Sequence, residues 1–135
     1  MRFGLGAFVL LIAMLFPAAA GAVDCADAGD QSTMNQCAGD EFKKSDAELN
    51  ALYKRIVQRL KDDAETLKLL VAAQRAWVGF RDAECVFQTA DWADGSAYPM
   101  YYAICADTVT KKRVDDFKTY LACEEGDGGC PLTAR

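Results

Sequence analysis

The sequence of 135 residues contains no histidine. Histidine is the usual base that activates serine and cysteine nucleophiles, so its absence excludes the Ser-His-Asp and Cys-His schemes. It also excludes the common zinc sites, apart from an all-cysteine site that an oxidising compartment disfavours. The chain has no phosphate-binding glycine loop either. We therefore expect neither an enzyme nor a protein that holds a metal or another cofactor.

The chain also lacks an apolar run that is long enough to span a membrane. Its longest run, residues 3–16, has about 14 residues, whereas a spanning helix needs about 20. Arg2 precedes this run, Pro17 ends it, and small residues follow, which is typical of a signal peptide. We predict a signal peptide over residues 1–22, cleaved after Ala22 or, as a second choice, after Ala20. We expect no stable membrane insertion after cleavage.

Basic residues are fewer than acidic ones, with 15 Lys and Arg against 20 Asp and Glu and a net charge of −5. Removal of the signal peptide takes away Arg2 alone among them, so 14 basic residues oppose 20 acidic ones and the charge becomes −6. This charge disfavours binding to nucleic acid or anionic lipid and suits a basic protein partner. The remaining residues 23–135 are long enough for a single domain with its own core.

Helical periodicity dominates the mature part, and we find no convincing strand alternation and no repeats. The first apolar stripe runs from about residue 33 to residue 61, and Thr33 with Gln36 predicts a capping box at its start. Leu49 and Tyr53 belong to this stripe, and Asn50 is expected to pack on the second helix or to hydrogen-bond to it.

A short turn at residues 61–63 leads into a second helix over residues 64–89, capped by Asp63 or by Asp62 with Glu65. So short a connection makes the two helices pack antiparallel. Its apolar surface comes from Leu67, Leu70, Trp77 and Phe80. After a loop, Pro99 can open a third helix that ends near Cys123. The predicted fold class is all-α: a long antiparallel helical hairpin plus a third helix, stapled by disulfides.

Six cysteines lie in the mature part, none of them in C-x-x-C spacing, and an even number in an exported chain predicts three disulfides. In the three-helix layout, Cys123 lies roughly 27 Å along the third helix from Cys105. Disulfide Cα atoms lie within about 7 Å of each other, so Cys123 must pair with Cys130. The four others gather at one end and allow three pairings. We favour Cys25–Cys37 with Cys85–Cys105; the main rival is Cys37–Cys85 with Cys25–Cys105.

The segment 73–85 places Gln74, Trp77, Arg81 and Glu84 on one side of a helix. We interpret them, with Arg113 of the third helix, as a buried polar network in which Arg81 stacks on Trp77. Arg81 would pair with Glu84 or with a carboxylate on the first helix. If so, Trp77→Ala should cost roughly 3–5 kcal/mol. The alternative is a recognition surface, because Trp and Arg are frequent binding hot spots.

The loop that follows combines aromatic and acidic residues: Asp91, Trp92, Asp94 and Tyr98. Such a mixture suits a patch that binds a basic protein. The alternative is a hydrophobic lid folded over the end of the bundle, because large aromatic side chains favour burial. The sequence leaves both interpretations open.

Several separated motifs point to one family. They are the pair Cys25 and Cys37, D-x-x-L-N-x-x-Y at residues 46–53, Q-R-x-W-x-x-F-R-D-x-x-C at residues 74–85, and Cys105 followed by Thr110 and Arg113. Together they resemble the lysozyme-inhibitor LprI-like N-terminal domain family of small exported bacterial proteins. The chain departs from the pattern at residues 94–96, and the pair Cys123/Cys130 is an addition. The resemblance implies a helical, disulfide-linked domain and binding to lysozyme.

The sequence therefore favours a periplasmic or secreted binding protein that inhibits lysozyme by occluding its active-site cleft. Lysozyme cleaves its substrate with two carboxylates in that cleft, so an inhibitor needs no chemistry of its own. The alternative function is a structural or adaptor role in the cell envelope, without lysozyme as a target.

Overall fold

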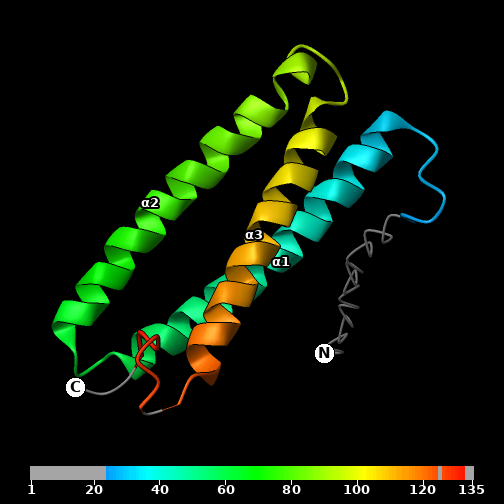
Figure 1. The fold of residues 1–135 in the computed structure, drawn as a ribbon. Coiled ribbons are helices and arrows are strands. Elements are labelled where there is room, and N and C mark those ends of the chain that lie inside the picture. The colour runs from blue at the N-terminus through cyan, green and yellow to red at the C-terminus, as the bar shows by residue number, and fades with distance from the viewer. Residues whose placement is uncertain (1–23, 125, 133–135) are drawn as a thin grey trace, which may run out of the picture.

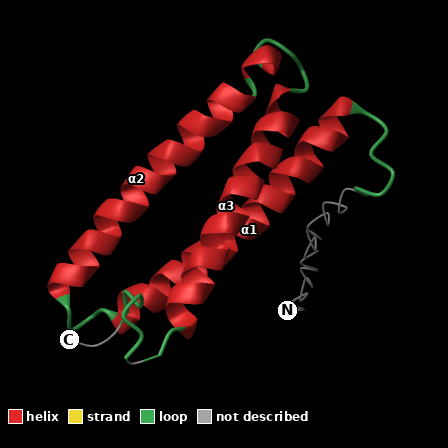
Figure 2. Ribbon diagram, in the orientation of Figure 1, coloured by secondary structure: helices red, strands yellow, loops and turns green. Residues whose placement is uncertain are grey.

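The structure, a computed structural model, describes residues 24–124 and 126–132, so the predicted signal peptide over residues 1–22 lies outside it. Three long helices follow one another: α1 (Gln31–Arg59), α2 (Ala64–Gln88) and α3 (Tyr98–Ala122), with the short 3₁₀ helix η1 (Ala90–Trp92) before α3. They run lengthwise past one another with loops at the ends (Figure 1), and the described residues contain no strand (Figure 2). The predicted all-α hairpin with a third helix is confirmed.

Aspartates cap the first two helices. Asp30 accepts hydrogen bonds from the amide of Thr33 at 3.0 Å and from its hydroxyl at 2.6 Å. The predicted cap at Thr33 is therefore wrong by three residues, because the Asp30 carboxylate already satisfies the free amide of that turn. Asp63 caps α2 by accepting a hydrogen bond from the amide of Thr66 at 3.0 Å. This confirms the first of the two caps that the sequence predicted for this helix.

The main core lies between α1 and α3, and most contacts between elements join these two helices. Leu49, Leu52 and Ile56 of α1 are buried against Val114 and Phe117 of α3. Apolar burial of this kind is the dominant stabilising contribution in a small domain. Neighbours in the chain are thus not the closest neighbours in space, because α1 packs on α3 and only secondarily on α2.

The helix α2 stands apart from the α1–α3 pair along much of its length (Figure 1). Leu67, Leu70 and Trp77 contact the main core while remaining only partly buried. Phe80 was predicted to belong to the same buried surface, and this is wrong, because its side chain is exposed. Phe80 lies about 60° around the helix from Trp77, which is enough to carry it past the narrow contact stripe.

Three disulfides link these elements. Cys25–Cys37 ties the N-terminal segment to α1, Cys85–Cys105 ties α2 to α3, and Cys123–Cys130 closes the tail, with Cα separations of 5.7, 5.5 and 5.7 Å. These are the pairs that the sequence favoured. Beyond Cys130 the chain turns back and buries Leu132 against the main core.

Candidate partner-binding surface

The N-terminal segment and the loop before α3 meet at one end of the bundle. The side-chain amide of Asn35 donates to the carbonyl of Ser96 at 2.9 Å, and the Gln31 amide contacts the sulfur of Met100 at 3.8 Å. The first turns of α1 and α3 therefore lie side by side, with the end of α2 joined to them by Cys85–Cys105. Residues far apart in the sequence form one surface there (Figure 1).

This surface carries acidic charge without basic charge. Neither residues 24–42 nor residues 82–110 contain a lysine or an arginine. Five aspartates on the two loops are exposed to solvent, and we call this group the acidic end: Asp24, Asp27, Asp30, Asp91 and Asp94. The hydrogen bond from the Thr33 hydroxyl lowers the pKa of Asp30 below its ordinary value of 3.8, which keeps this member ionised at neutral pH.

Aromatic rings adjoin the acidic end. The Trp92 ring stacks on Tyr101 with a centroid distance of 4.2 Å, and 44 % of Trp92 remains exposed. Tyr98 packs against Tyr102 at 6.0 Å and is half-buried. Trp92 thus has one face covered and part of its surface free, which combines features of the predicted lid and of the predicted binding patch. A half-exposed tryptophan beside carboxylates is suited to protein contacts.

A turn holds this loop in shape. The amide of Gly95 donates to the carbonyl of Trp92 at 2.8 Å, and a Cβ atom at position 95 would lie 3.3 Å from that same oxygen. A side chain there would crowd the backbone, so glycine lets the turn close tightly. Asp91 and Asp94 flank Trp92 in the chain at this turn, and both are exposed.

The predicted polar network lies elsewhere, between α2 and the α1–α3 pair. Arg81 of α2 donates to Asp46 of α1 at 3.2 Å and to Asp82 at 2.9 Å. Its guanidinium carbon lies 5.2 Å from the ring centre of Phe42 and 5.3 Å from that of Trp77. Only 12 % of the Arg81 side chain is exposed, so the cation is held between two rings and two carboxylates.

Arg113 of α3 completes the other half of this network. Its Nε atom donates to the side-chain oxygen of Gln74 at 3.2 Å, and its guanidinium carbon lies 5.9 Å from the Trp77 ring centre and 4.6 Å from that of Phe117. Trp77 therefore stands between two arginines, one from α2 and one from α3. This arrangement joins the three helices where α2 has little apolar contact with the others.

Two sequence expectations about these side chains differ from the structure. Of the two carboxylate partners expected for Arg81, the one on the first helix is present as Asp46, whereas Glu84 accepts a hydrogen bond from Gln88 at 2.7 Å. Asn50 is exposed and donates to the carbonyl and carboxylate of Asp46 on its own helix, not to α2. The Asp46 carboxylate is the member that the sequence interpretation left unnamed. It is the first residue of the D-x-x-L-N-x-x-Y segment, so that motif carried the signal.

The geometry offers no metal chemistry within residues 24–124 and 126–132, where no three Cys, Asp or Glu side chains group together as ligands. In the same part of the chain, no helix has both the length and the apolar character to cross a membrane. The burial of Tyr102 raises the pKa of its phenol, and the nearby Asp82 carboxylate acts in the same direction, so this phenol stays neutral at physiological pH.

These features define a small helical domain, stapled by disulfides, whose exposed loops form an acidic and aromatic surface. The family model of the lysozyme inhibitor LprI matches residues 24–117, and the chain belongs to this family. The match spans the three helices up to Phe117 and ends before the Cys123–Cys130 pair.

Two other proteins are similar to the chain. The chain is 32 % identical over 113 residues to an uncharacterized protein of Rhizobium meliloti (strain 1021), covering 76 % of this chain and 81 % of the relative. It is 37 % identical over 68 residues to the uncharacterized protein YecT of Escherichia coli (strain K12), covering 44 % of this chain and 42 % of the relative. No solved structure matches the chain at a significant level.

Proposed function

We propose that this protein is exported and inhibits lysozyme by placing its acidic end over the active-site cleft. Membership of the LprI family supports the class of target. The observation that carries the proposed surface is the separation of charge: residues 24–42 and 82–110, which build this end, contain no basic residue. Three disulfides in a small domain are in keeping with a periplasmic or secreted location.

The electrostatics favour a basic partner. Lysozymes are commonly basic proteins, and complementary charge accelerates encounter while fixing the orientation of the complex. Asp91 and Asp94 lie beside the half-exposed Trp92, so charge and apolar surface are available together. Salt screens interactions between exposed charges, and the association should therefore weaken as ionic strength rises.

No catalytic group is required for this function. Lysozyme depends on two carboxylates in a cleft that must admit the glycan, so an inhibitor acts by excluding the substrate. The half-exposed Trp92 supplies a residue type that often dominates binding energy.

The direct test is an assay of cell-wall hydrolysis by several lysozyme types, with the purified protein carrying its disulfides. We expect inhibition at micromolar protein in low salt, and weaker inhibition in high salt. If none of the lysozymes is inhibited, the lysozyme function is wrong and a structural or adaptor role in the cell envelope takes its place.

A further inference from the structure

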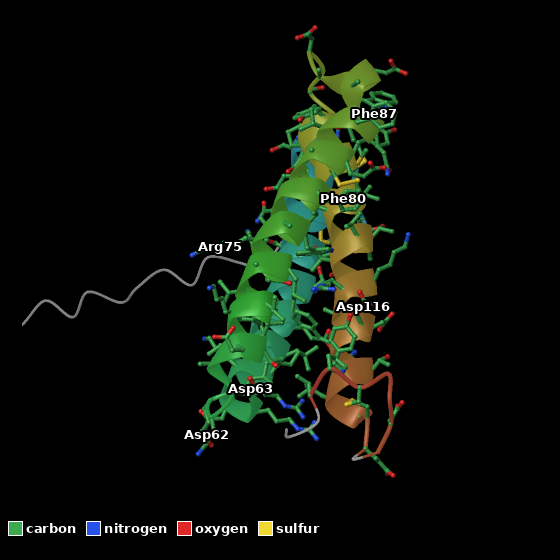
Figure 3. All side chains as sticks on the ribbon, turned by 60° about the vertical axis from the view of Figure 1, so that its left-hand side comes forward. Asp62, Asp63, Arg75, Phe80, Phe87 and Asp116 are labelled. Atoms are coloured by element: carbon green, nitrogen blue, oxygen red, sulfur yellow. A yellow bond between two sulfur atoms is a disulfide. The ribbon has the colours of Figure 1, made fainter. Side chains whose placement is uncertain are left out.

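One flank of α2 carries a row of exposed apolar residues, and its first two members, Leu69 and Ala73, also border the cavity between α2 and the α1–α3 pair. Its residues follow one another at alternating spacings of four and three, and all of them are exposed. We call this row the α2 seam, and its members are Leu69, Ala73, Ala76, Phe80, Ala83 and Phe87. Figure 3 shows Phe80 and Phe87 along the same side of α2 and Arg75 on the other.

The spacing of the α2 seam is that of a coiled coil. An alternation of four and three residues repeats every seven, and such a repeat keeps one stripe of a helix facing a partner helix. At 1.5 Å per residue the stripe from Leu69 to Phe87 is about 27 Å long. Phe80 and Phe87 are 58 % and 76 % exposed, although apolar rings of this size are among the most buried residue types.

The adjacent side of α2 is already used. Trp77 and Arg81 face the α1–α3 pair, and Cys85 is fully buried by its disulfide to α3. The α2 seam therefore does not compete with the folding of the domain. It is an additional surface on a helix that already contacts the α1–α3 pair through Trp77, Arg81 and Cys85.

From these observations we propose that the α2 seam binds the α2 seam of a second copy of this chain, in antiparallel orientation. A two-fold axis near residue 78 would set Leu69 against Phe87 of the second copy and Phe80 against Ala76. Large side chains then pack on small ones near the centre, as coiled-coil packing requires. A parallel arrangement would set Phe80 against Phe80 and Ala76 against Ala76. The two phenylalanine rings would then crowd each other, and the two alanines would leave a gap.

Charge favours the same occupant and the same orientation. The helix α2 has three basic and three acidic residues, so it is neutral in a chain whose mature part carries −6. Two copies can therefore meet on α2 without bringing their excess negative charge together. An antiparallel pair holds the two acidic ends far apart, whereas a parallel pair would place them side by side. A basic lysozyme, by contrast, would be drawn to the acidic end.

Sedimentation equilibrium of the purified protein over a concentration series tests the pairing. We expect a species of twice the chain mass, and we expect Phe80→Glu to weaken dimerisation at least about 30-fold, as loss of an interface hot spot does. Ile104→Glu is the matched control, because Ile104 is 48 % exposed on α3 and lies off the seam. Both substitutions replace exposed side chains, so circular dichroism should show the same helix content in all three proteins.

A charge pair tests the orientation. In the antiparallel dimer Ala73 faces Ala83 of the second copy, so Ala73→Glu and Ala83→Lys should each weaken it. The double variant Ala73→Glu/Ala83→Lys should recover dimerisation, because each glutamate then meets a lysine. In a parallel dimer the double variant would set like charges against each other and associate least.

Three results would overturn the proposal. The first is a protein that stays monomeric up to about 1 mM, because its dissociation constant for pairing would then exceed that concentration. The second is a dimer that Phe80→Glu leaves unchanged, or a double variant that does not recover. The third is a monomer that binds lysozyme or lipid vesicles through Phe80, which would assign the seam to another occupant. The proposal does not depend on inhibition, since dimerisation is measured without lysozyme.

Discussion

The α1–α3 pair and the helix α2 are held by different kinds of interaction. Between α1 and α3 the buried residues are almost all apolar, with Ile56 and Phe117 completely buried. Between α2 and this pair the contacts are two arginines around Trp77, a few partly buried leucines and one disulfide. Both sets of contacts join helices of similar length, so length alone does not determine how a helix is held.

The difference suggests a division of roles within a small domain. Apolar burial makes the α1–α3 pair the stable frame, since buried apolar surface dominates the free energy of folding. The helix α2 is held by the contacts of Trp77, Arg81 and Cys85 along a narrow stripe, which leave the α2 seam and the following loop exposed. The α2 seam thus lies on the helix with the fewer buried residues, and the loop that follows this helix contributes Asp91, Trp92 and Asp94 to the proposed recognition surface.

The largest expected effect on stability is in the core between α1 and α3. Phe117→Ala should lower the free energy of unfolding by about 3–5 kcal/mol, because it empties a fully buried aromatic site. Phe87→Ala, an exposed phenylalanine on α2, should change it by less than about 0.5 kcal/mol. Urea denaturation at low protein concentration measures both. Equal losses would contradict the assignment of the core to α1 and α3.

The disulfide of α2 comes next. Cys85→Ala/Cys105→Ala should cost about 2–4 kcal/mol, because it opens the covalent link between α2 and α3. The Cys123–Cys130 disulfide closes a shorter loop, so Cys123→Ala/Cys130→Ala should cost about 1 kcal/mol less. Amide hydrogen exchange should show that the first pair of substitutions exposes α2 before α1. Uniform loss of protection across all helices would show that α2 unfolds together with the α1–α3 pair.

Trp77 tests the contact stripe itself. Trp77→Ala should cost about 2 kcal/mol, less than the 3–5 kcal/mol of a fully buried tryptophan, because the ring is only partly buried. Trp77→Phe keeps a ring between Arg81 and Arg113 and should recover most of the loss. Thermal unfolding of the three proteins measures the difference. A loss as large as that of Phe117→Ala would make the stripe part of the main core.

The smallest effect concerns the cap of α1. The Thr33 hydroxyl lowers the pKa of Asp30 in the folded protein, so its carboxylate contributes fully above its ordinary pKa of 3.8. That contribution is lost as the pH falls through the lower pKa of the folded state. The difference in melting temperature between the protein and Asp30→Asn should therefore shrink as the solution is acidified through this range. A difference that is independent of pH would show that the charge of Asp30 does not act in the cap.

Much of this architecture could be predicted from the sequence. Helical periodicity gave the three helices, and the height of each cysteine along the bundle, about 1.5 Å per residue, selected Cys123–Cys130. The heights of the other four cysteines allowed three pairings, and the favoured one is the one that the structure contains. Periodicity shows which face of a helix is apolar but not which helix covers it. For that reason the closeness of α1 to α3 and the exposure of Phe80 were not foreseen.

Local competition explains the smaller errors. Thr33 has a good capping side chain, but Asp30 three residues earlier accepts the same amide more strongly as a carboxylate. Glu84 has the right spacing to reach Arg81, but Arg81 donates to the carboxylates of Asp46 and Asp82 instead. The Glu84 carboxylate accepts a hydrogen bond from the Gln88 side chain. The position of Asp91 and Asp94 beside the N-terminal aspartates depends on tertiary structure, which sequence spacing does not contain.

The central claim is that the acidic end and its aromatic loop, and not the charge of the protein as a whole, bind lysozyme. Asp91→Asn/Asp94→Asn removes two negative charges there, and Asp62→Asn/Glu124→Gln removes two exposed charges elsewhere, with Asp62 at the opposite end from Phe87 (Figure 3). The measurement is the inhibition constant of each variant against a basic lysozyme in low salt. We predict about tenfold weaker inhibition for the first variant, or about 1.4 kcal/mol, and little change for the second. Equal weakening of both variants would contradict the claim.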